Sequence, residues 1–208
     1  MANAAPRDVP RVAAGVALAC IGLALCPPAV NAWLAYDRQA ILAGQVWRLW
    51  SAHLVHFSVQ HALADALVFF LLAALAERQI GARRLGVCMA LGAPLISAGL
   101  LLTAPNLAYY RGASGIAVTV AVLAGASLWR VQPARRGVLL LLAAIFLIKT
   151  ACEAFGVASA LANLPPDVVV AWQAHALGAA WGLLTAMSCR CPDSEAGERG
   201  MFNRSARF

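Results

Sequence analysis

The chain has 208 residues, of which 62% are hydrophobic and only 12% are charged, and its formal net charge is +7. A water-soluble domain carries about twice this share of charged residues. The composition therefore excludes an ordinary soluble protein and predicts an all-α integral membrane protein embedded in a lipid bilayer. The excess of arginine is typical of cytoplasmic loops, so we expect no nucleic-acid partner.

Six apolar runs are each long enough to cross a bilayer as a helix, which takes roughly 17–25 residues. They cover about residues 11–30, 59–76, 85–104, 112–130, 137–155 and 168–188. We expect one six-helix core over residues 1–190, followed by a short, disordered cytoplasmic tail over residues 191–208. The first run has a second interpretation as a cleaved signal peptide, because the small residues at Ala29–Ala32 follow it.

Between the first two runs, residues 31–58 do not form a clean span. The segment contains charged residues together with the aromatic residues Trp33, Tyr36, Trp47 and Trp50. Amphipathic rings of this kind concentrate at the membrane surface. We therefore expect this segment to be an interfacial loop on the outer side.

The basic residues favour one orientation. With the N-terminus in the cytoplasm, twelve of them fall inside and four outside, a bias that places both termini in the cytoplasm. The inside set is Arg7, Arg11, Arg78, Arg83, Arg84, Arg130, Arg135, Arg136, Arg190, Arg199, Arg204 and Arg207, and the outside set is Arg38, Arg48, Arg111 and Lys149.

Polar side chains inside a bilayer are costly, so each one is a candidate for function. The main candidates within the runs are His61, Asp65, Ser114 and His175. In the expected orientation the second, fourth and sixth runs all begin on the outer side, and these residues lie near their beginnings. They should therefore meet in the outer half of the membrane. Lys149 and Glu153, four residues apart in the fifth run, are most simply a pair with each other.

Glycine spacing indicates which helices meet. In "AHALGAAWG", the residues His175, Gly178 and Gly182 lie on one helical face, and small residues on a face let another helix approach closely. Gly112 and Gly115 flank Ser114 in the same way. A lone serine is usually a packing residue and a lone histidine a satisfied core residue. Together, at one depth and on small-residue faces, they favour a nucleophile and its base.

Other chemistries fit less well. The chain has no His-Glu-x-x-His motif, and Asp65 is the only aspartate well inside a run, which argues against zinc and paired-aspartate proteases. Metal binding by His56, His61 and His175 lacks a ligand-spacing signature. We expect no metal and no cofactor.

Four motifs, in order, resemble those of the rhomboid intramembrane serine proteases. "WRLWSAHLVHFSVQHALAD" resembles their first loop followed by the histidine of helix two, and "ERQIG" resembles the turn after that helix. "RGASG" resembles their Gly-x-Ser-Gly motif, and "AHALGAAWG" their Ala-His-x-x-Gly-x-x-x-Gly motif. The resemblance implies a six-helix rhomboid-like bundle.

The resemblance also implies a Ser–His dyad of Ser114 and His175. An oxyanion hole would come from the Ser114 backbone N–H and from His61, with Gly112 and Ala113 supporting it. Gly115, Gly178 and Gly182 would serve helix packing, and Arg48, Glu77 and Gly81 would be structural, with Arg48 anchoring the loop and Glu77 partnering a helix terminus.

The chain departs from the family pattern at two positions. Asp65 stands where the family usually has an asparagine donor. It could be protonated and donate, it could stay ionised and hold His61 protonated, or it could merely orient a water or a neighbouring helix. Val118 replaces the aromatic residue or histidine that often packs on the catalytic imidazole, which leaves the orientation of the His175 ring unexplained.

Within the family, the motif "YRGASG" and the minimal six-helix core are most similar to the rhombosortase group. This similarity implies a multi-pass protein of the bacterial inner membrane. Its substrates would be exported proteins with a C-terminal sorting tail, composed of a glycine-rich motif, a membrane helix and a basic end. The alternative is a rhomboid-like pseudoprotease that binds membrane helices without cleaving them.

Overall fold

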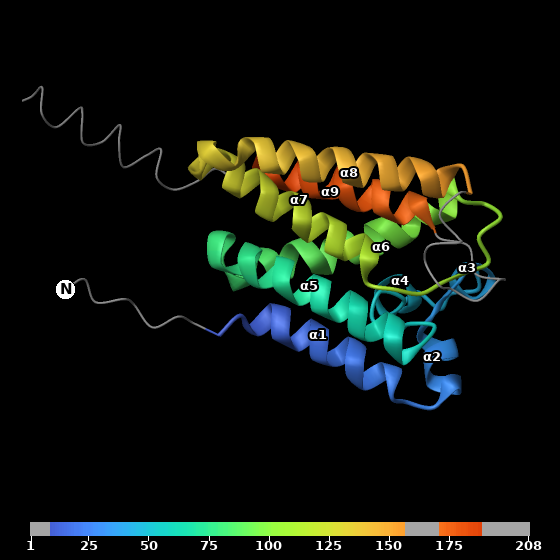
Figure 1. The fold of residues 1–208 in the computed structure, drawn as a ribbon. Helices are drawn as coiled ribbons and strands as arrows, with labels where there is room; N and C mark the ends of the chain where they lie inside the picture. Colours follow the sequence, from blue (N-terminus) through green and yellow to red (C-terminus); the bar gives the residue numbers. More distant parts are fainter. Residues whose placement is uncertain (1–8, 157–170, 189–208) are drawn as a thin grey trace, which may run out of the picture.

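The computed structural model describes residues 9–156 and 171–188 (Figure 1). Its long helices are α1 (Arg11–Ala24), α5 (Val59–Ile80), α6 (Ala82–Thr103), α7 (Ser114–Val131), α8 (Arg136–Ala154) and α9 (Trp172–Ser188). The connections hold α2 (Pro28–Leu34), β1 (Tyr36–Asp37), α3 (Arg38–Leu42), α4 (Arg48–Ser51), β2 (Tyr109–Tyr110) and a 3-10 turn at Pro133–Arg135. The expected tail, residues 191–208, lies outside the described residues.

Within the described residues, four helices are long and apolar enough to cross a membrane, which supports a multi-pass membrane protein. They are α5, α6, α7 and the segment Pro133–Ala154, which contains α8. α9 has 17 residues, and the first three positions of the run expected at 168–188 lie outside the described residues.

The first run is shorter than expected. Its helix, α1, ends at Ala24 after 14 residues, and residues expected to continue it to position 30 instead begin α2. The reason is the Pro27–Pro28 pair. Proline has no backbone N–H to donate within a helix, and it disfavours helical geometry in the residue before it. Pro28 is therefore the start of a new helix.

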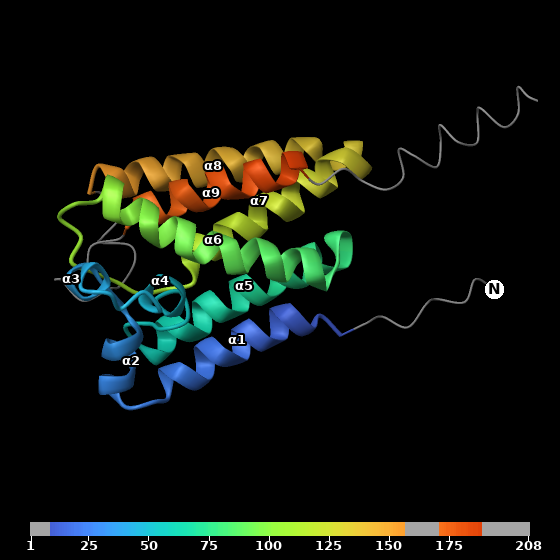
Figure 2. The same ribbon diagram turned by 180° about the vertical axis from the view of Figure 1, so that it is seen from behind.

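Small residues hold the bundle together. The buried face of α1 consists of Ala13, Ala17 and Cys20, three or four residues apart, and it packs against α5. α5 in turn buries Ala62, Ala66, Phe69, Ala73 and Ala76. Figures 1 and 2 show α1 beside α5 on one side of the bundle, with α7, α8 and α9 on the other. Side chains of this size let helices approach closely in a membrane, where hydrophobic collapse cannot drive association.

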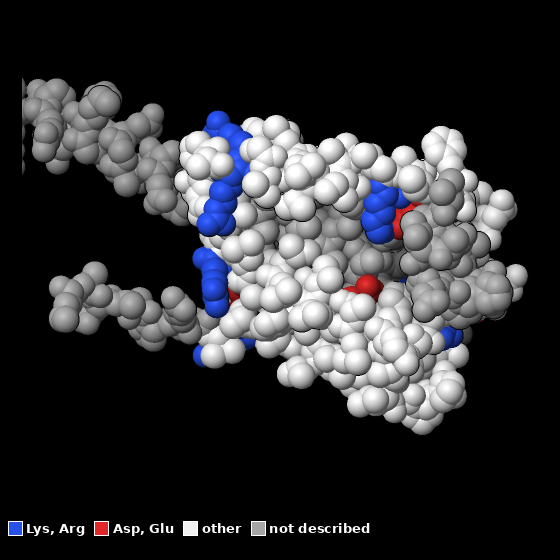
Figure 3. All heavy atoms as spheres, viewed as in Figure 1, with Lys and Arg blue, Asp and Glu red and all other residues white. Residues whose placement is uncertain are grey.

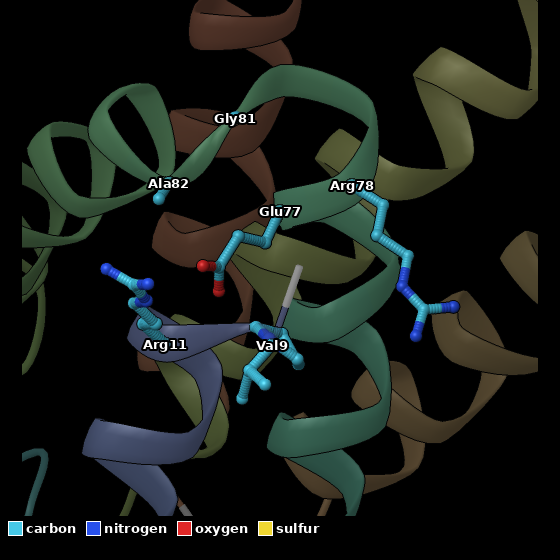
Figure 4. Close-up of a pocket in the computed structure, with 7 residues that line it drawn as sticks. Val9, Arg11, Glu77, Arg78, Gly81 and Ala82 are labelled. Carbon is cyan, nitrogen blue, oxygen red and sulfur yellow. The ribbon is translucent and has the colours of Figure 1, made fainter. Parts of the chain in front are cut away.

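Glu77 connects the end of α5 to the beginning of α1. Its carboxylate accepts hydrogen bonds from the backbone N–H groups of Val12 (3.3 Å) and Ala13 (3.0 Å). Figure 4 shows the carboxylate directed toward the first turn of α1. The first N–H groups of a helix have no acceptor within it, so a carboxylate placed there satisfies them. Gly81, with φ +85°, makes the turn from α5 into α6.

Basic side chains collect at one end of the bundle (Figure 3). This is the end where α5 and α7 finish and where α1, α6 and α8 begin, and its members are Arg11, Arg78, Arg83, Arg84, Arg130, Arg135 and Arg136. The opposite end carries the loop and the beginnings of α5, α7 and α9. The two ends of the bundle therefore differ sharply in charge.

The fold is not purely helical. β1 and β2 pair antiparallel, with Tyr36 opposite Tyr110 and Asp37 opposite Tyr109. Each strand has only two residues. The pairing matters because β2 ends four residues before Ser114, so it fixes the loop of residues 31–58 against the start of α7.

Arg48 anchors that loop from within. Its guanidinium is buried and donates to the carbonyl oxygens of Ala32 (2.9 Å) and Ala35 (2.6 Å) and to the side chain of Gln45 (2.7 Å). A planar group with five donors can bridge several acceptors at once. Arg48 thereby joins α2, α4 and the chain between them.

His53, which the sequence does not single out, connects the loop to α6. Its Nε2 lies 3.0 Å from the Ala93 carbonyl oxygen and 3.0 Å from Ser97 Oγ, while Ser97 donates to the Leu49 carbonyl at 2.9 Å. The ring is 1% exposed. Burial disfavours the charged form and lowers the pKa of His53 to about 4. The imidazole is therefore neutral and donates from Nε2.

This neutral histidine predicts an acid-sensitive fold. The unfolded chain takes up a proton near pH 6.5 whereas folded His53 does so near pH 4, so stability should fall as the pH drops through that window. The full effect is about 3 kcal/mol at ~1.4 kcal/mol per pH unit. In detergent, the melting temperature of His53→Gln should fall less between pH 7 and pH 4 than that of the wild type. The glutamine keeps a donor toward the Ala93 carbonyl. An identical dependence in both proteins would contradict this role.

Candidate functional site

Ser114 is the first residue of α7. The chain reaches it from β2 through Gly112, whose φ of +138° is readily adopted only by glycine. Two hydrogen bonds hold this turn: the Gly112 N–H donates to the Ala52 carbonyl (3.1 Å), and the Tyr110 hydroxyl donates to the Gly112 carbonyl (2.9 Å). The serine hydroxyl is thus presented at a helix N-terminus by a braced turn.

His175 faces Ser114 from α9. Its Nε2 lies 3.0 Å from Ser114 Oγ, although 61 residues separate the two in the sequence. The imidazole is buried, whereas Ser114 is partly exposed. A hydroxyl and an imidazole at this distance are within reach of direct proton transfer.

Glycines allow α7 and α9 to approach this closely. A side chain at Gly178 would collide with the Gly115 carbonyl oxygen, and one at Gly182 would come within 2.8 Å of the Thr119 carbonyl oxygen. Thr119 Oγ1 adds a hydrogen bond to the Gly178 carbonyl at 2.9 Å. Backbone therefore packs on backbone directly below the Ser114–His175 pair.

Gly112 does not share this role. The sequence pattern groups it with Gly115 as a packing residue of the fourth helix, but α7 begins only at Ser114. A Cβ at Gly112 would point instead at Asp65 Oδ2 (3.4 Å) and at His61 Cε1 (3.6 Å). Gly112 therefore faces α5, because the positive φ turns the chain before the helix starts.

Glu153 is the unexpected member of the site. Its Oε2 lies 2.8 Å from His175 Nδ1, while its Oε1 pairs with Lys149. The expected pair of Glu153 with Lys149 is present, and in addition the second carboxylate oxygen reaches across to α9. The sequence offers one indication of this contact, because Glu153 and His175 both lie near the outer ends of their runs and so at a similar depth in the membrane. A carboxylate also has two oxygens, so Glu153 can contact a second partner.

Asp65 lies between two histidines and the turn before Ser114. Its Oδ2 accepts the Ala113 N–H (3.1 Å) and lies 3.3 Å from His56 Nε2 and 3.5 Å from His61 Nε2. The His56 and His61 rings meet edge to face, with centroids 5.1 Å apart. The part played by His56 is not evident from the sequence, because His56 lies in the loop before α5 and no helical spacing relates it to Asp65.

Two N–H groups near the serine differ in availability. The Ala113 N–H, expected to support the oxyanion hole, already donates to Asp65. The Ser114 N–H lies in the first turn of α7, where backbone donors have no acceptor within the helix and the helix dipole favours negative charge. In the described part of the chain, no three His, Cys, Asp or Glu side chains are arranged to hold a metal ion.

Most of the chain matches the model of one known family. The Rhomboid domain family model matches residues 43–190, which is more than two thirds of the chain and includes the loop anchor, Ser114 and His175. A search of curated proteins gives no match to this chain. Rhomboid family members are generally intramembrane serine proteases that act on membrane proteins within the bilayer. The chain belongs to the rhomboid family.

Proposed function

We propose that this protein is an intramembrane serine endopeptidase in which Ser114 is the nucleophile and His175 the general base. The observation that carries the proposal is the 3.0 Å separation of His175 Nε2 and Ser114 Oγ at the N-terminus of α7. A serine kept only for packing would not need an imidazole nitrogen aimed at its hydroxyl. A pseudoprotease would have no use for this pair.

The reaction follows from the geometry. As Ser114 Oγ forms a bond to the substrate carbonyl carbon, its proton passes to His175 Nε2. That proton then moves to the amide nitrogen as the carbon–nitrogen bond breaks, which leaves an acyl-enzyme. A water molecule gives a proton to Nε2 and attacks the acyl carbon, and Ser114 regains its proton when the acid product leaves. The free Ser114 N–H stabilises the developing oxyanion.

For Asp65, we propose the ionised state. Asp65 Oδ2 accepts the Ala113 N–H and lies beside two imidazole nitrogens, each of which can donate to it in the tautomer with its proton on Nε2. These contacts favour a carboxylate, which only accepts hydrogen bonds. In this state Asp65 holds the His61 ring beside the turn before Ser114, where the imidazole would help to stabilise the oxyanion.

Asp65→Asn tests that assignment. The neutral amide accepts a hydrogen bond from His61 more weakly than the carboxylate does, so kcat/KM should fall about tenfold or more. His61→Gln should show a similar loss, and the double variant should lose less than the two losses combined. If Asp65 is a protonated donor, Asn should keep its activity at neutral pH. A pH–rate profile unchanged by Asp65→Asn would leave the residue structural.

We further propose six membrane spans, with α1 and α9 as the two shorter ones and both termini in the cytoplasm. The arginine-rich end of the bundle supports this orientation, because basic residues are retained on the cytoplasmic side. The site then opens toward the outer face of a bacterial inner membrane. The rhombosortase-like motifs favour, as substrates, exported proteins with a C-terminal sorting tail of a glycine-rich motif, a membrane helix and a basic end.

Co-expression tests the activity and the substrate together. The protein is produced with an exported protein that ends in such a tail, and a matched substrate has the membrane helix of the tail deleted. We expect a shortened product only from the intact tail and only with active enzyme. Cleavage of unrelated membrane helices, with the sorting tail left intact, would contradict the substrate assignment but not the protease activity.

A further inference from the structure

α8 is an apolar helix on the outside of the bundle, and it has one buried residue. Leucine and isoleucine cover its surface, and Glu153 is the single buried residue among Arg136–Ala154. Its side chain is only 3% exposed, whereas that of Lys149, one turn earlier, is 56% exposed. A carboxylate is among the most expensive groups to bury in a bilayer unless it is paired. We therefore expect buried Glu153 to have a partner within the bundle.

That partner is His175. Because an ionised carboxylate only accepts hydrogen bonds, the 2.8 Å contact requires His175 Nδ1 to carry a proton. In a neutral imidazole the other nitrogen, Nε2, then has a free lone pair, and it is Nε2 that faces Ser114 Oγ. The contact selects the tautomer that can receive the serine proton.

We propose that Glu153 is a positioning residue that holds the His175 ring in its working tautomer and stabilises the imidazolium formed during the reaction, making the site a Ser–His–Glu triad. This inference rests on the proposed protease function. It also answers the question raised by Val118, since the ring is held by a carboxylate from α8 instead of an aromatic neighbour on α7.

The surrounding charges fit this role. His175 is contacted by Ser114 from α7 and by Glu153 from α8, and Lys149 on α8 neutralises the other carboxylate oxygen. Asp65 is engaged on the α5 side by His56, His61 and the Ala113 N–H. When His175 takes up a proton, the carboxylate in direct contact with it is thus that of Glu153.

The test breaks the Lys149–Glu153 pair from each side. If Glu153 served only that pair, Glu153→Gln and Lys149→Met would cause similar losses. If Glu153 positions His175, Glu153→Gln should lower kcat by about 100-fold to 10,000-fold with little change in KM, since the residue does not touch substrate. Lys149→Met should lose far less. Leu147→Ala, on the exposed face of the same helix, is the control for changes to α8.

A measurement on the unmodified protein avoids any question of misfolding. The chain has only four histidines, so nitrogen-15 labelling of histidine gives few signals, and His175→Gln identifies the one from His175. We expect neutral His175 to carry its proton on Nδ1. A proton on Nε2, or wild-type kcat in Glu153→Gln, would overturn the proposal. Loss of the protease function itself would appear differently, as a wild type that fails to cleave or a Ser114→Ala variant that still cleaves.

Discussion

Ser114→Ala and His175→Ala are each expected to abolish cleavage while the protein still inserts and folds. The first removes the atom that forms the acyl-enzyme, and the second removes the base 3.0 Å from it. The loss should be on the order of 10⁶-fold in kcat, as found when either member of such a pair is removed. Cleavage of a tailed substrate in proteoliposomes measures it.

The double variant provides the control. Because nucleophile and base act as one unit, losing both should cost little more than losing either one. Thermal unfolding should leave Ser114→Ala near wild type, since it only shortens a side chain. His175→Ala should still fold, because the Gly178–Gly115 contact is intact, but with lower stability, because buried Glu153 loses a partner. Substantial cleavage by either single variant would show that the reaction takes place elsewhere, and additive losses would show that the two residues act independently.

The second large effect is expected at Gly178. A Cβ there collides with the carbonyl oxygen of Gly115, the residue that follows the nucleophile. Gly178→Val should push α9 away from α7 and separate His175 from Ser114, and a shift of about 1 Å can lower the rate on the order of 100-fold. Gly178→Ala should show the same defect to a lesser degree.

A matched control exists on α7, where Gly125 has more room around it than Gly178 has on α9. A Cβ at Gly125 would meet only Leu139, at 4.0 Å, which is an ordinary contact. Gly125→Ala should therefore cleave at close to the wild-type rate. Initial cleavage rates, corrected for the folded fraction of each variant, make the comparison. Normal cleavage by Gly178→Val would show that the α7–α9 contact does not set the geometry of the site.

The features that the sequence predicts well depend on spacing along one helix. His175, Gly178 and Gly182 fall on one face because of the helical repeat, and in the structure that face packs on α7. The common depth of Ser114 and His175 follows from counting residues along two spans that both begin on the outer side. The break after α1 was not expected, although the Pro27–Pro28 pair that causes it is visible in the sequence.

The features that the sequence does not predict depend on how helices are rotated about their axes. Glu153 and Lys149 are four residues apart, so a local pair accounted for both charges, and nothing in the sequence shows that the second carboxylate oxygen faces α9. His53 and His56 belong to a loop without a repeat, so their partners on α6 and α5 could not be inferred from spacing.

Labelling with a serine-directed phosphonate tests the central claim most directly, because it reports on the nucleophile without requiring a known substrate. The purified protein is labelled in detergent, and the modified residue is identified by peptide mass spectrometry. If Ser114 is activated by His175, the label should be on Ser114 in the wild type and should be absent from both Ser114→Ala and His175→Ala. An unlabelled wild type, a label on another serine, or undiminished labelling of Ser114 in His175→Ala would contradict the account.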